Sequence, residues 1–110
     1  MNDENYTVAF EIITNAGNSK SASLMAIEAA REFDFEKATE YLEEAKESMH
    51  LAHDAHFDMI QNEANGNSVD VNIILVHAQD HLTMAIMAND YALEMIELYR
   101  MIQKLMKGEM

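Results

Sequence analysis

The sequence has 110 residues, enough to close one compact core. Seven Lys and Arg residues against twenty Asp and Glu residues give a net charge of −13, which excludes a nucleic-acid binder because phosphate contacts need clustered cations. Cys and Pro are absent and Gly occurs three times, which excludes disulfides, thiolate metal sites and a turn-rich β-fold. With no apolar run long enough to span a membrane and no signal peptide, we expect a single domain over residues 1–110, cytoplasmic and not inserted in the membrane.

The first helix is predicted over residues 3–32. Apolar residues between Val8 and Ala30 recur every three or four positions, which is the period of an α-helix. Gly17 interrupts this pattern, and we expect a bend there. Asp34 is suited to cap the next helix, because its carboxylate can accept hydrogen bonds from the free backbone N–H groups.

Two further helices are predicted over residues 35–65 and 68–107. Gly66 suits the left-handed residue that follows a helix, Asn67 or Ser68 can cap the next helix, and Gly108 ends the last one. Three long helices with short connections predict an all-α, three-helix bundle with up-down-up topology.

The third predicted helix carries two apolar stripes. Their positions differ by two residues, about 200° around a helix, so the stripes lie on nearly opposite sides. A lone three-helix bundle needs one stripe, so the second predicts self-association through this helix. The first stripe comprises Val71, Leu75, Ala78, Leu82, Ala85, Asn89, Ala92, Ile96 and Tyr99. The second comprises Ile73, His77, Asp80, Met84, Met87, Tyr91, Glu94, Leu98, Met101 and Leu105.

Asp80 is out of place in an apolar stripe. An ionised carboxylate there is costly unless it is paired or binds a metal, and copies brought together in an oligomer repel unless a cation lies between them. Oxygen ligands favour a hard ion such as Mg²⁺ or Ca²⁺. The alternative is that Asp80 lies at the edge of the stripe and is solvated.

The densest polar cluster is His77-Ala78-Gln79-Asp80-His81. His77 could be a nucleophile that accepts a group on a ring nitrogen, or the cluster could bind a metal. The H-x-x-D-H spacing is also similar to a zinc hydrolase motif, although that motif uses Glu as its base. A histidine with a purely structural hydrogen bond is the remaining alternative.

Three more histidines, His50, His53 and His56, repeat at intervals of three in the second helix. They could form a transition-metal patch, but this spacing spreads them across a face, and we favour a solvated surface.

The run Leu75-Val76-His77-Ala78-Gln79-Asp80-His81-Leu82 resembles the signature of enzyme IIA of the lactose/cellobiose class, a phosphocarrier of the bacterial sugar phosphotransferase system. Residues 16–21 (AGNSKS) and 34–38 (DFEKA) resemble segments of the same family, and Ala52-His53 and Leu98-Tyr99 also fit, so the resemblance covers residues 6–105. Thr83 stands where the family more often has Met, and Phe33 where Gly often precedes Asp-Phe.

The resemblance implies a homotrimer of three-helix bundles and a phosphotransferase component that releases no small-molecule product. It implies that His77 accepts a phosphoryl group from HPr and passes it to a cysteine of the cognate IIB component. It also implies that Asp80 of three chains shares one divalent cation, for which we expect Mg²⁺. It does not identify the sugar.

Gln79 and His81 are polar neighbours of His77 in the sequence. Gln79 and His81 are expected, from their residue types alone, to support the phosphate or orient His77, or to be ordinary packing residues. The alternative to the phosphocarrier is a non-enzymatic, metal-binding helical oligomer, with a zinc hydrolase third.

Overall fold

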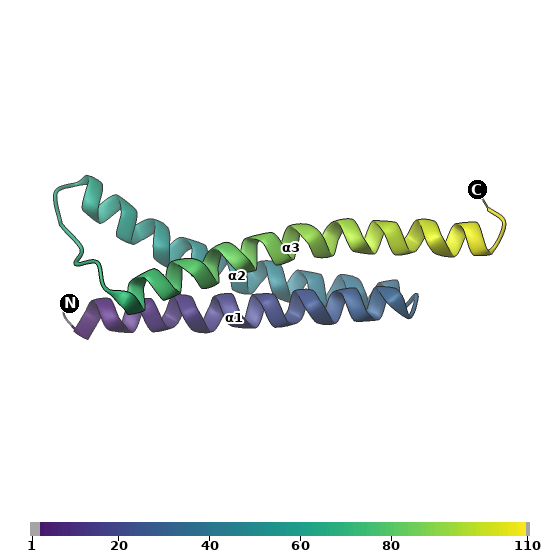
Figure 1. Cartoon of the computed structure of the whole chain (residues 1–110), viewed down its shortest axis with the longest axis horizontal. Coiled ribbons are helices and arrows are strands. Elements are labelled where there is room, and N and C mark those ends of the chain that lie inside the picture. The colour runs from purple at the N-terminus through teal and green to yellow at the C-terminus, as the bar shows by residue number, and fades with distance from the viewer. Residues whose placement is uncertain (1–2, 110) are drawn as a thin grey trace.

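The computed structural model of the protein describes residues 3–109 and contains three helices, α1 (Asp3–Arg31), α2 (Phe35–Ala64) and α3 (Ile73–Met106). Within these residues there is no strand. The chain runs along the long axis of the molecule in α1, returns in α2 and runs forward again in α3 (Figure 1). The bundle measures 60 × 21 × 19 Å. The predicted all-α, up-down-up bundle is therefore confirmed.

All three helices end in the same hydrogen-bonded turn. Just after each helix, a backbone N–H donates to the carbonyl five residues earlier. The three bonds run from Asp34 to Ala29 (2.9 Å), from Asn67 to Asn62 (2.9 Å) and from Glu109 to Lys104 (2.8 Å). The residue before each donor has a left-handed backbone, with φ of 60° at Phe33, 92° at Gly66 and 73° at Gly108. The two glycines lie where the sequence predicts, whereas Phe33 adopts a conformation that costs a non-glycine residue about 1–2 kcal/mol.

The helix starts are set by side-chain caps. A side-chain oxygen of Asp34 accepts from the backbone N–H of Lys37 at 3.2 Å, as predicted. The predicted start of the third helix at residue 68 is wrong, because Asn72 and not Asn67 or Ser68 is its cap and accepts from the N–H of Leu75 at 3.0 Å.

The later start of α3 changes one stripe. β-Branched Val69 and Val71 lose side-chain freedom in a helix, and both precede the helix here, so Val71 leaves the first stripe. At the other end of the chain, α1 continues through Gly17 without interruption, as the predicted helix over residues 3–32 requires.

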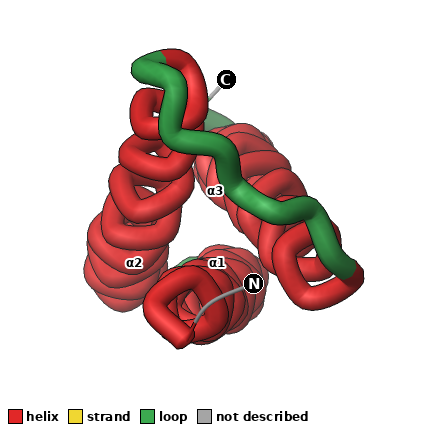
Figure 2. Tube along the Cα trace, turned by 90° about the vertical axis from the view of Figure 1, so that its left-hand side faces the viewer, coloured by secondary structure: helices red, strands yellow, loops and turns green. Residues whose placement is uncertain are grey.

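The core is built mostly from small side chains. Among the described residues, eleven of the sixteen buried hydrophobic residues are alanine, and the other five are Ile12, Leu42, Leu75, Leu82 and Ile96. Viewed end-on, the three helices form a triangle, with the α2–α3 loop crossing one end (Figure 2). The first stripe of α3 is buried from Leu75 to Ile96, as predicted.

One polar group interrupts this core. The amide nitrogen of Asn89 lies 2.8 Å from the hydroxyl of Ser19, 3.0 Å from that of Ser23 and 3.0 Å from the carbonyl of Ala85. The hydroxyl of Ser19 in turn donates to the carbonyl of Ala45 in α2 at 2.6 Å. The contacts of Asn89 and Ser19 therefore join all three helices, while the buried Oδ1 of Asn89 has no partner among the described residues.

Candidate functional site

The second stripe of α3 is exposed along the whole helix, and it frames the candidate site. Large apolar side chains in it range from 41% exposed at Met84 to 83% at Ile73. In a single chain these large apolar side chains are exposed to water, whereas most of the buried apolar residues are alanine. The structure therefore confirms that α3 presents two opposed apolar faces, one of them uncovered.

His77 and His81 form the closest pair in the polar cluster. Their positions are one turn apart on α3, and their Nε2 atoms lie 3.0 Å from each other. The rings meet edge to face with centroids 4.5 Å apart. Because one Nε2 must donate and the other accept, the two rings share one hydrogen bond that fixes their orientation. His77 is exposed and His81 is half-buried, so His77 is the ring that a docking molecule can reach.

Gln79 lies on the other flank of α3 and does not join this pair. Its side-chain nitrogen lies 3.2 Å from Nε2 of His56 in α2. Burial lowers the pKa of His56, and the nearby His53 lowers it further. His50 and His53 are exposed, as expected, whereas His56 is half-buried and contacts Gln79. Helical spacing assigns a residue to a face but does not reveal which neighbouring helix it meets, so the sequence alone could not show this contact.

Asp80 is exposed in the N-terminal part of the uncovered stripe. The described residues of one chain contain no group of three or more His, Cys, Asp or Glu side chains that could hold a metal ion. A carboxylate site at Asp80 therefore needs carboxylates from further copies of the chain.

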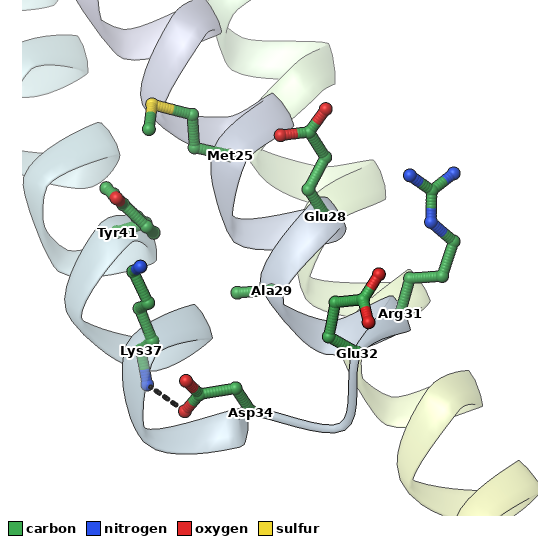
Figure 3. Close-up of a pocket in the computed structure, with 8 residues that line it drawn as sticks. All are labelled: Met25, Glu28, Ala29, Arg31, Glu32, Asp34, Lys37 and Tyr41. Carbon is green, nitrogen blue, oxygen red and sulfur yellow. Dashed lines mark hydrogen bonds between the residues drawn. The ribbon is translucent and has the colours of Figure 1, made fainter.

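A cavity of about 350 Å³ lies at the other end of the bundle, where α1 turns into α2 (Figures 1 and 3). Acidic Glu28 and Glu32 and basic Arg31 and Lys37 line it together with the cap Asp34. Figure 3 shows that Asp34 is occupied by its bond to the backbone of Lys37. The cavity contains neither His77 nor His81, so the candidate chemistry is on the open surface of α3 and not in this pocket.

The geometry and the sequence agree with one family. Residues 7–100 match the family described as "PTS system, Lactose/Cellobiose specific IIA subunit". The chain belongs to this family of sugar phosphotransferase components. It is the family that the run HAQDHL (residues 77–82) resembles.

Several relatives are similar over nearly their whole length. The lichenan-specific phosphotransferase enzyme IIA component of Bacillus subtilis is 42% identical, with 93% of each chain covered. The lactose-specific EIIA component of Staphylococcus epidermidis is 37% identical over 89% of this chain and 94% of its own. The crystal structure of the cellobiose-specific enzyme IIA of Bacillus anthracis superposes with a TM-score of 0.88 at 34% identity, and 94% of each chain is covered.

The hydropathy of the helices adds one finding. None of the three described helices combines the length and the apolar character needed to cross a membrane.

Proposed function

We propose that this chain is a cytoplasmic phosphocarrier that accepts a phosphoryl group from HPr on His77 and passes it to a cysteine of a cognate IIB component. The carrying observation is an exposed imidazole at position 77, held by His81, in a chain of the lactose/cellobiose IIA family. Relatives named for lichenan, lactose and cellobiose all match, so the family does not select the sugar.

The proposed transfer asks little of the protein beyond positioning. A lone pair on a ring nitrogen of neutral His77 attacks phosphorus, while the N–P bond of the donor phosphohistidine breaks and its ring leaves with the electron pair. The proton on the other ring nitrogen of His77 is then released to solvent and the departed donor ring takes one up, so both rings end neutral. In the second transfer the IIB thiolate attacks phosphorus, and the His77 ring leaves with the electron pair of the N–P bond and takes up a proton from solvent. Both steps need an accessible ring with a fixed orientation, which the His77–His81 hydrogen bond supports.

Gln79 and His81 take different positions in this proposal. His81 is the orienting residue, because it bonds to the His77 ring directly. Gln79 faces α2, so it contributes no group to the phosphate on His77 of its own chain.

We further propose that three copies pack along the uncovered stripe of α3 and share one divalent cation, Mg²⁺, through Asp80. The distribution of apolar side chains supports this assembly, since alanine fills the core while Met, Leu and Tyr of the stripe are exposed. Three copies of Asp80 that meet in this stripe would supply carboxylate oxygens, the ligands that Mg²⁺ prefers. Because the stripe around them is apolar, few other groups could offset their charge. The ion would offset their charge and hold the chains together.

The experiment is phosphorylation by enzyme I, HPr and labelled phosphoenolpyruvate. Wild type should gain an acid-labile, base-stable label, and His77→Ala should gain none while its circular dichroism spectrum and oligomer size stay unchanged. His81→Ala should still be labelled, but more slowly. Full labelling of His77→Ala would refute the assignment, and retained metal without any label on wild type would favour the non-enzymatic metal-binding oligomer.

A further inference from the structure

His56 and Gln79 join α2 directly to the part of α3 that carries His77. Nε2 of Gln79 lies 3.2 Å from Nε2 of His56. Gln79 is two residues from His77, on the opposite flank of the same helix. The contact therefore ties α2 to the helical turn of the proposed nucleophile without touching the nucleophile itself.

This contact requires one protonation state of His56. In the orientation that the structure gives the Gln79 amide, its nitrogen donates, so Nε2 of His56 accepts and the ring proton is on Nδ1. A protonated imidazole would place two donors opposite each other, so this hydrogen bond would break unless the Gln79 amide turned its oxygen toward the ring. The contact in this orientation thus depends on a neutral His56, while the amide of Gln79 does not change its charge near neutral pH.

The surroundings of His56 favour that neutral ring. A small cavity of about 70 Å³ adjoins it, and the other lining residues are Met59, Ile60, Glu63, Val69, Val71, Leu75 and Gln79. Glu63 of α2 is the one charged side chain in this lining; it is exposed, and no ion pair joins it to His56 within the described residues. On α2 itself, His53 is a second titratable neighbour, while α3 and the loop contribute only uncharged side chains to the lining and α1 contributes none.

The His56–Gln79 contact lies in the C-terminal part of α2. Figure 1 shows the C-terminal part of α2 diverging from α1 toward the α2–α3 loop. Less packing holds a helix that diverges from its neighbour, so a single cross-helix hydrogen bond there has more influence on where α2 lies relative to α3.

We propose that His56 is a proton-sensitive positioning residue, which in its neutral form accepts a hydrogen bond from Gln79 and holds α2 against the His77 turn of α3, and which releases Gln79 when protonated. The protonated ring moves toward water, because the lining beside it is mostly apolar. The effect on phosphoryl transfer rests on the proposed function of His77. Its sign is fixed: the tie is complete at neutral pH and is lost as the pH falls below the ordinary histidine pKa of about 6.5.

The tie itself is tested by ¹⁵N NMR of the full-length protein between pH 7.5 and 5. The ring of His56 should carry its proton on Nδ1 at neutral pH, and the side-chain amide resonance of Gln79 should shift with the titration of His56. In His56→Gln the partner remains but cannot titrate, so the Gln79 resonance should stop responding to pH. His53→Gln is the matched control, because it removes a neighbouring titratable ring and should leave the response of Gln79 in place.

The consequence is tested by single-turnover phosphorylation with phospho-HPr over the same pH range. Wild type should lose rate on acidification more steeply than His56→Gln, by about 2- to 10-fold, the range that one hydrogen bond spans. His56→Leu, which has no partner for Gln79 at any pH, should be slow at neutral pH as well. A proton on Nε2 of neutral His56, a Gln79 bond that persists at pH 5, or identical pH profiles for wild type and His56→Gln would each overturn the proposal. If no variant is labelled at all, the proposed function of His77 fails, and the NMR result still decides the tie.

Discussion

Replacement of Asp80 by Leu tests whether a carboxylate in the uncovered stripe needs a cation. Six large side chains of the stripe, Met84, Met87, Tyr91, Leu98, Met101 and Leu105, are 41–59% exposed. At roughly 100 Å² each they offer about 600 Å² per chain, or about 15 kcal/mol as an upper bound at 25 cal/mol per Å².

The opposing term is smaller but not negligible. Two carboxylates about 4 Å apart repel by about 4 kcal/mol at an effective dielectric constant of 20, so three pairs oppose a trimer by about 12 kcal/mol. Apolar burial on three chains exceeds this repulsion even after the cost of association. We therefore expect a wild-type trimer that survives chelation but melts at a lower temperature, and an Asp80→Leu trimer whose melting temperature ignores chelator.

Light scattering and thermal melts at pH 7, with and without chelator, measure both outcomes. Asp80→Asn is the matched control, because it keeps the side-chain shape and removes the charge, and it should also lose sensitivity to chelator. A folded Asp80→Leu monomer would refute the reasoning about apolar burial. A wild-type protein that holds no metal and melts identically in chelator would show that Asp80 is not a metal ligand in this chain.

Three substitutions test the fold that positions the site, each measured by urea unfolding. Phe33→Gly should be more stable than Phe33→Ala by about 0.5–1 kcal/mol, the reverse of the usual order in helices, because φ is 60° there; equal stabilities would mean that the left-handed turn is not strained. Gly17→Ala should stabilise the protein by about 0.5–1 kcal/mol, since an added Cβ meets no atom within 4 Å; a loss would reveal a contact on that face. Asn89→Ala should cost about 2 kcal/mol or more, because it removes buried hydrogen bonds to Ser19 and Ser23; an unchanged midpoint would show that this polar cluster adds no stability.

The sequence predicts the bundle well because long helices leave a regular record. The stripe from Leu75 to Ile96 is buried as its spacing predicts, and Asp34 and Gly66 mark a helix start and a helix end. The start of α3 is mispredicted because several residues of the α2–α3 loop can cap a helix. Which of them does so depends on where the loop lets α3 meet α1, and local propensity does not contain that information.

The site is predicted less completely than the fold. His77 and His81 are one turn apart in sequence, so their proximity follows from helix geometry alone. The Gln79–His56 contact joins residues 23 positions apart on different helices, and it depends on the crossing of α2 and α3. Asp80 lies on the uncovered face as its position predicts, while its proposed metal and partner chains lie beyond what a single chain contains.

The alanine-rich core has a consequence for how the protein responds to dilution. Each buried alanine removes much less apolar surface from water than a buried leucine would, so a lone chain gains little from closing its own core. If most of the burial comes from the uncovered stripe, folding and association form one equilibrium, and the unfolding midpoint rises with protein concentration. Below a threshold concentration, chains would then be unfolded and open to proteolysis, whereas above it association would protect them.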